Sequence, residues 1–90
     1  MRYSFDPAKD AANLLKHGIS LTEGDGVLCD PLGLTIEDSC SEGERRWVSI
    51  GMNTFGEPRV VVWSQHLAMV RIISVRKPAP KERRAYEKGI

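Results

Sequence analysis

The fold of this 90-residue chain is decided by the stretch MVRIISVRKPAPKERRAYE, residues 69–87. Its first half is a predicted strand, because β-branched residues suit a pleated and largely covered surface. Pro78 and Pro80 end the strand, since proline cannot donate to a sheet, and Pro80 also suits the first turn of a helix. The residues that follow are mostly good helix formers, and Gly89 is placed to end that helix.

Two arginines interrupt the apolar half of this stretch. Because strand side chains alternate, Ser74 and Arg76 should share one face with Ile72, while Arg71 shares the other with Ile73. An arginine within an apolar strand is costly unless an anionic or polar group receives it. The stretch therefore predicts a surface that holds something negative.

The N-terminal third of the chain predicts a short strand and two helices. Residues 1–5 alternate weakly, and Asp6 and Pro7 can cap and begin a helix over residues 8–17, which Gly18 closes. An apolar stripe at helical spacing should face the core, and its members are Ala8, Ala11, Ala12 and Leu15. A second set on another face, either solvated surface or one wall of a polar groove, is Lys9, Asn13 and Lys16.

The second predicted helix begins at a capping box, with Ser20 as the cap and Glu23 reaching back to it. Gly24 and Gly26 weaken this helix by about 1 kcal/mol each relative to alanine, so it should be short. Asp30 and Pro31 end it.

The rest of the chain predicts a meander. Strands are expected at residues 32–37, 44–52 and 59–64, with an acidic loop at 38–43 and a hairpin connection at 65–68. Three consecutive valines in the third of these strands indicate burial on both faces. The order is β-α-α-β-β-β-β-α, which predicts one α+β domain over residues 1–90: an antiparallel twisted sheet with two N-terminal helices and a C-terminal helix.

Charge is unevenly distributed although the net charge is only +1. Residues 1–44 carry −6, residues 45–70 carry +2 and residues 71–90 carry +5. This asymmetry fits a basic surface for phosphate chemistry or for an acidic partner. It also fits an ordinary solvated helix beside acidic loops.

Composition and cysteine content narrow the class of protein. The chain is 41% hydrophobic and 28% charged, with neither a signal-peptide pattern nor a run of roughly 18 apolar residues, so we expect a cytoplasmic protein. Cys29 and Cys40 are expected to remain thiols. His17, His66 and the two cysteines lack ligand-like spacing, so no metal or other cofactor is expected. A Cys–His nucleophile pair stays open.

What remains is a set of cations beside possible proton carriers. The cations are Lys9, Arg46, Arg71, Arg76, Arg83 and Arg84, and the titratable or hydroxyl groups are His17, Glu44, Ser74, Glu82 and Tyr86. Arginines can stabilise the charge that builds up on a phosphate during cleavage. Because RNA supplies its own 2′-hydroxyl nucleophile, a metal-free ribonuclease needs only a base, an acid and such cations.

Blocks along nearly the whole chain resemble the BrnT family, toxins of bacterial type II toxin–antitoxin pairs. The most specific are Asn13-Leu14-Leu15-Lys16-His17-Gly18 and Arg71-Ile72-Ile73-Ser74-Val75-Arg76; the others are Phe5-Asp6-Pro7-Ala8-Lys9, Asp30-Pro31-Leu32, Ser41-Glu42-Gly43-Glu44-Arg45-Arg46-Trp47, Ile50-Gly51 and Glu82-Arg83-Arg84-Ala85-Tyr86-Glu87. One departure is Gly24-Asp25-Gly26, which stands where such proteins usually carry a Glu/Ala-rich helix, so the second helix is expected to fray.

The resemblance implies a RelE-like fold, metal-independent endoribonuclease activity and neutralisation by a BrnA-type antitoxin in an oligomeric complex. By the same resemblance Arg46 and Arg76 would lie at the RNA phosphate, with Glu82, Tyr86 and His17 as further catalytic candidates. Lys9, Arg71, Arg83 and Arg84 would bind RNA. The identity of the general base stays open.

Structural readings of the same residues remain. Arg76 could be paired with Glu82 or Glu44, and Tyr86 could only pin the C-terminal helix to the sheet. Arg83 and Glu87 are four residues apart, the ordinary spacing of an ion pair on a helix. A positively charged His17 would suit its position at a helix end. The competing function is a non-catalytic module that binds a partner protein or nucleic acid.

Overall fold

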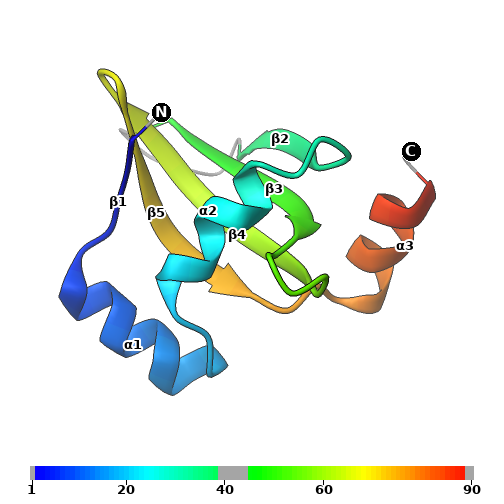
Figure 1. Cartoon of the computed structure of the whole chain (residues 1–90), viewed down its shortest axis with the longest axis horizontal. Helices are drawn as coiled ribbons and strands as arrows, with labels where there is room; N and C mark the ends of the chain where they lie inside the picture. Colours follow the sequence, from blue (N-terminus) through cyan, green and yellow to red (C-terminus); the bar gives the residue numbers. More distant parts are fainter. Residues whose placement is uncertain (1, 39–44, 89–90) are drawn as a thin grey trace.

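The computed structural model describes residues 2–38 and 45–88 as a five-stranded sheet with helices around it (Figure 1). The elements are β1 (Arg2–Ser4), α1 (Pro7–His17), the 3₁₀ turn η1 (Leu21–Glu23), α2 (Gly24–Leu28), β2 (Leu34–Asp38), β3 (Arg46–Met52), β4 (Pro58–His66), β5 (Met69–Arg76) and α3 (Pro80–Lys88). This confirms the predicted order and the α+β class. Most of the expected acidic loop, and the helix stop at Gly89, lie outside the described residues.

The strands are arranged in the order β1-β5-β4-β3-β2. Strands β2 to β5 form the expected antiparallel meander, whereas β1 joins the outer edge of β5 in parallel. Alternation of side chains does not encode strand direction, so the sequence could not distinguish these two pairings. The central position of β4 explains the buried Val60 and Val61, as the valine run predicted.

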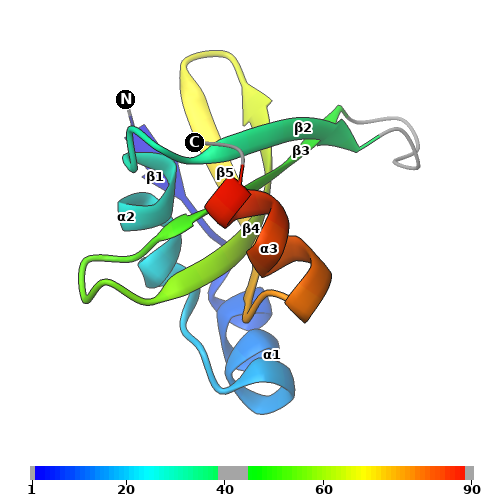
Figure 2. The same cartoon turned by 90° about the vertical axis from the view of Figure 1, so that its right-hand side faces the viewer.

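One face of the sheet carries the main hydrophobic core, which η1 and α2 cover. Its members are Ile19, Leu21, Val27, Val61, Ile72 and Val75. Figure 1 shows α3 far from α1, and Figure 2 views the molecule from the side of α3, which lies in front of the sheet. Because the strand residues nearest α3 alternate with those of the main core, α3 lies over the opposite face.

Helix α2 is short but formed, so the expected fraying is not observed. A Cβ atom at Gly24 would lie 2.9 Å from Cδ1 of the buried Ile72, so the glycine permits a close approach of helix and sheet. Ser20 does cap the turn, but its Oγ accepts from the Thr22 N–H. The Glu23 carboxylate accepts instead from Asn53 Nδ2 at 2.9 Å, so that half of the predicted capping box is wrong.

Helix α1 begins and ends as predicted but turns a different face inward. Asp6 accepts from the Ala8 N–H, and Gly18 adopts the left-handed conformation at φ 70°. The predicted apolar stripe is wrong, since Leu15 is 90% exposed. Asn13 is buried instead: its Nδ2 donates to the Val75 carbonyl at 2.8 Å, and the Val75 N–H donates to its Oδ1 at 3.4 Å. The Asn13 amide thus pairs with backbone groups of β5, and this need to satisfy buried backbone groups, rather than apolar burial, decides which face of α1 turns inward.

The β4–β5 connection is tighter than expected. Gln65 and His66 still belong to β4, and only Leu67 and Ala68 turn, with Leu67 at φ 56°. Within residues 2–38 and 45–88, no helix has the length and apolar character needed to cross a membrane.

Candidate active site

A register shift in β5 decides which arginines share a face. Pairing of β4 with β5 slips between Val62 and Trp63: Val62 lies opposite Ser74, whereas Trp63 lies opposite Ile72. Ile73 is therefore an extra residue, as in a β-bulge. Ile72 and Val75 consequently pack in the same core cluster, so the prediction that Ser74 and Arg76 share a face with Ile72 is wrong.

The bulge brings Arg71 and Arg76 to one face, although they are five residues apart. Arg71 lies opposite Ser64, which lies opposite Arg46, and Arg76 lies opposite Val60. Directly opposed residues in antiparallel strands share a face. The face that α3 partly covers therefore presents three arginines, from β3 and β5.

The centre of this arrangement is a row across three strands: Arg46 on β3, Ser64 on β4 and Arg71 on β5. Ser64 is fully buried, at 0% exposure, and Arg71 is exposed. Neither Ser64 Oγ nor the buried Arg46 Nε has a hydrogen-bond partner among the residues that the structure describes. We call these three residues the Arg46–Ser64–Arg71 row. Such a row can accept an anion.

Arg76 is already paired. Its Nη1 and Nη2 donate to the two carboxylate oxygens of Glu82 at 2.7 and 2.8 Å, and the side chains are 34% and 29% exposed. Glu82 also accepts from the Ala79 N–H at the start of α3. The hydrogen bond from Arg76 holds the pKa of Glu82 below its usual value, and Glu82 raises that of Arg76. An ionised carboxylate with a lowered pKa is a weak general base at neutral pH.

Tyr86 is buried and its hydroxyl donates to Asp30 Oδ2 at 2.8 Å. This hydrogen bond, together with burial, raises the pKa of Tyr86, so the phenol stays protonated at neutral pH. The contact fastens α3 to the loop between α2 and β2. This contact fits the interpretation that Tyr86 holds the C-terminal helix in place.

The remaining predicted residues lie elsewhere. Lys9 and Arg71 line a hollow of about 380 Å³ with Ser4, Phe5 and Asp6, at the start of α1. His17 is half-buried in the last turn of α1. Of the nine predicted site residues, Lys9 and Arg71 therefore meet at this hollow, and His17 belongs to a different part of the molecule.

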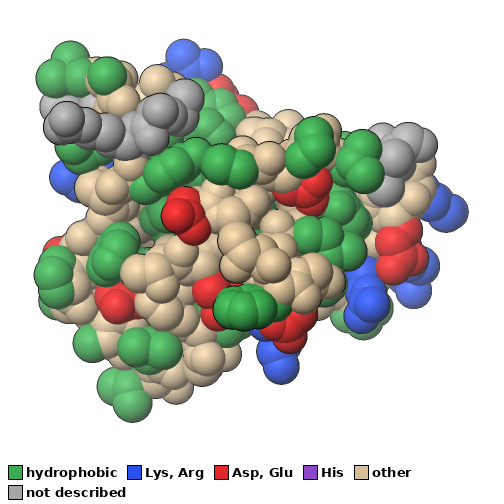
Figure 3. All heavy atoms as spheres, in the orientation of Figure 1, with side chains coloured by type: hydrophobic (Ala, Val, Ile, Leu, Met, Phe, Trp, Pro, Cys, Tyr) green, Lys and Arg blue, Asp and Glu red, His purple; other side chains and the backbone are tan. Residues whose placement is uncertain are grey.

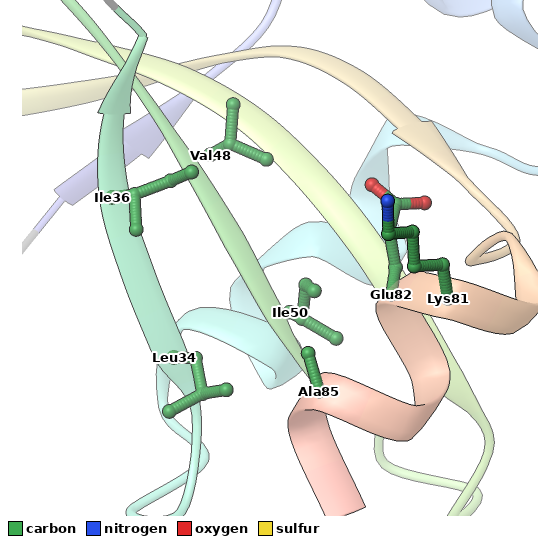
Figure 4. Close-up of a pocket in the computed structure, with 7 residues that line it drawn as sticks. All are labelled: Leu34, Ile36, Val48, Ile50, Lys81, Glu82 and Ala85. Carbon is green, nitrogen blue, oxygen red and sulfur yellow. The ribbon is translucent and has the colours of Figure 1, made fainter. Parts of the chain in front are cut away.

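Helix α3 adds exposed cations and borders an apolar groove. Arg83 and Arg84 are exposed, and Arg83 Nε pairs with Glu87 at 3.4 Å. Figure 3 shows Lys and Arg side chains at the α3 end of the molecule. The groove between α3 and strands β2 and β3 has a volume of about 280 Å³ (Figure 4), and its lining residues are Leu34, Ile36, Val48, Ile50, Lys81, Glu82 and Ala85. Apolar side chains, rather than phosphates, would fit there.

Sequence reasoning missed Ser64 and Asp30. No local pattern distinguishes Ser64 from other strand serines, because its position between two arginines depends on pairing across strands. The sequence predicts Asp30 only as a helix end, although Asp30-Pro31-Leu32 is one of the blocks that carry the family resemblance. In the structure it accepts from the Leu32 N–H, the Met52 N–H and Tyr86.

Comparisons with known proteins agree with this architecture. The crystal structure of the Brucella abortus ribonuclease toxin BrnT superposes with a TM-score of 0.64 and 18% sequence identity, over 88% of this chain and 97% of that one. At this identity the likeness establishes the fold. A comparison with curated protein sequences found no match. The family described as "Ribonuclease toxin, BrnT, of type II toxin-antitoxin system" matches residues 5–82, and the chain therefore belongs to the BrnT family of type II toxins.

Proposed function

We propose that this protein is an endoribonuclease toxin that cleaves RNA without a metal ion and is neutralised by a BrnA-type antitoxin. The observation that carries the proposal is the placement of Arg46, Arg71 and Arg76 on one face of the sheet. Rigid strands direct these cations better than loops would. Membership of a family of ribonuclease toxins supports RNA as the substrate.

In this proposal charge stabilisation does most of the chemical work. The 2′-hydroxyl of RNA attacks the adjacent phosphorus, the 5′-oxygen leaves, and a 2′,3′-cyclic phosphate forms. Arg46 and Arg71 hold the phosphate and stabilise the negative charge that develops on its oxygens. Arg76, engaged by Glu82, orders the junction between β5 and α3 beside them. Lys9 extends the cationic surface beyond Arg71.

One proton must leave the 2′-hydroxyl and another must reach the departing 5′-oxygen. Glu82 is ionised and can accept a proton, but its lowered pKa makes it a poor base. Tyr86 and His17 stay as candidates from the family resemblance. If the ionised Glu82 takes the proton of the 2′-hydroxyl, neither its charge nor that of the arginines changes between about pH 6 and 9, so cleavage should change little with pH over that range.

The decisive experiment follows a labelled RNA oligonucleotide with purified protein in excess EDTA. We expect cleavage with a 2′,3′-cyclic phosphate end, and resistance when the nucleotide at the cut carries a 2′-deoxy sugar. Arg46→Ala combined with Arg71→Ala should abolish cleavage while the melting temperature stays near that of the parent. Intact RNA at every protein concentration, with antitoxin binding preserved, would establish the non-catalytic binding module instead.

A further inference from the structure

The hydroxyl of Ser64 is in an unusual position for a buried serine. It is fully buried on the central strand β4, and it has no hydrogen-bond partner within the described part of the chain. Buried polar groups in native proteins almost always have a partner, and an exception calls for an explanation. Ser49 shows the ordinary case: it is 3% exposed and bonds both Thr35 Oγ1 at 2.7 Å and Trp63 Nε1 at 2.8 Å.

The neighbours of Ser64 indicate what the missing partner would be. Arg46 and Arg71 flank it on the two adjacent strands, and neighbouring strands lie about 4.8 Å apart, so the two arginine backbones are about 10 Å apart. Long guanidinium side chains can converge over the serine from both sides. The buried Arg46 Nε also lacks a partner in the described residues, so two unsatisfied donors lie next to each other.

We propose that the Arg46–Ser64–Arg71 row is a phosphate site, in which the Ser64 hydroxyl donates to a non-bridging oxygen of an RNA phosphodiester held by the two arginines. This deepens the proposed function, on which it rests. The hydroxyl is fully buried in the free protein, so in this proposal a neighbouring side chain moves aside when the phosphate binds. The exposed Arg71 has that freedom.

The charge of the row selects an anion. The Arg46–Ser64–Arg71 row has one further neighbour at each end: Asp38 lies opposite Arg46, and Ser4 lies beside Arg71. The two cations are therefore at the centre of these five positions, and the one carboxylate among them is at an end. The hollow that Arg71 shares with Lys9 extends the cationic path toward α1. A single-stranded RNA backbone crossing the strands would therefore meet Arg46, Ser64 and Arg71 before Lys9.

The test compares Ser64→Ala with Ser49→Ala, a matched buried serine on the opposite face. Each variant is measured for melting temperature, single-turnover cleavage of an RNA oligonucleotide, and binding of the same oligonucleotide as non-cleavable 2′-O-methyl RNA. Ser64→Ala should lower cleavage and binding by about tenfold to a hundredfold, as expected for a lost hydrogen bond to a charged group. Its melting temperature should equal or exceed that of the parent, because an unpaired buried hydroxyl has been removed.

Ser49→Ala should show the opposite pattern: a lower melting temperature, because Ser49 loses its two hydrogen bonds, with cleavage and binding per folded molecule unchanged. Parent-like cleavage and binding by Ser64→Ala would overturn the proposal and make Ser64 a small space-filling residue. A clear loss of stability, or failure to fold, would also overturn it, since the hydroxyl would then have a structural role. If the parent itself does not cleave RNA, the proposed function fails, while the binding arm with 2′-O-methyl RNA still tests this site separately.

Discussion

The Tyr86 hydroxyl lies 2.8 Å from Asp30 Oδ2, across 56 residues of sequence, and it links the last helix to the loop that follows α2. Asp30 also accepts from two backbone N–H groups, those of Leu32 and Met52. Burial works to raise the pKa of Asp30, but these three hydrogen bonds together lower it below its usual value. A single carboxylate thus organises the end of β3, the loop before β2 and the docking of α3.

Replacement of Tyr86 by phenylalanine should reduce stability without abolishing cleavage. One hydrogen bond to a charged group is lost while the ring still packs, so we expect a cost of about 1–2 kcal/mol. For a domain of this size that lowers the melting temperature by about 4–16 °C. Thermal melting and RNA cleavage are measured on the same sample. A loss of cleavage by about 10²–10⁴-fold with a parent-like melt would instead identify Tyr86 as an acid in the reaction.

Stability should fall in acid because two carboxylates hold α3. The pKa of Asp30 and that of Glu82 are both lowered in the folded protein. Their contribution is complete above the unfolded values of about 3.9 and 4.3, and it is lost as the pH falls from there through the lower folded values. Melting temperatures between pH 7 and pH 2 measure the effect. Asp30→Asn should flatten the acid limb, and an identical limb in this variant would show that other groups cause it.

Arg76→Ala should lower stability by about 1 kcal/mol, because the pair with Glu82 is partly solvated and water can take over the carboxylate. A fully buried pair would cost about 3–5 kcal/mol instead. We expect cleavage to fall, but less than for Arg46 or Arg71, since Arg76 is engaged by Glu82. Arg76→Lys should recover part of the stability only, because lysine lacks the planar fork. If Arg76→Ala abolishes cleavage with a normal melt, Arg76 itself holds the phosphate.

Asn13→Leu should be among the most destabilising single changes outside the core. Asn13 is 7% exposed, and its Nδ2 donates to the carbonyls of both Ile19 and Val75. Leucine leaves these buried carbonyls without that donor, at about 1–3 kcal/mol for each unsatisfied group. Leu15→Ser on the exposed side of the same helix is the control and should melt near the parent. Chemical denaturation of the two variants checks the difference.

Antitoxin binding is proposed to cover the basic end of the molecule around α3. Reversing charge with Arg83→Glu and Arg84→Glu should weaken the complex and change its salt dependence, because both residues are exposed. Titration calorimetry at two salt concentrations measures this. Leu15→Lys on exposed α1 is the matched surface variant and should bind as the parent does. Loss of binding in Leu15→Lys alone would place the interface on α1.

Element order and most boundaries were readable from the sequence, because they depend on neighbours along the chain. Asp6 and Pro7 begin α1, Gly18 ends it, and Pro80 begins α3, each by a local backbone preference. Three consecutive valines predicted a strand covered on both faces, and β4 is the central strand. The pairing of Arg76 with Glu82 was one of the predicted alternatives, because the two residues are only six positions apart, on either side of the turn from β5 into α3.

Only the tertiary structure decided which side chains meet across strands. The bulge at Ile73 places Arg71 and Arg76 on the same face, whereas simple alternation separates them, because register depends on the partner strand β4. Asn13 faces inward because backbone groups of Val75 need a partner, which no helical periodicity reveals. The position of Ser64 between two arginines likewise depends on pairing among three strands. Local chain chemistry therefore determines the elements of this protein, and long-range backbone pairing determines its candidate site.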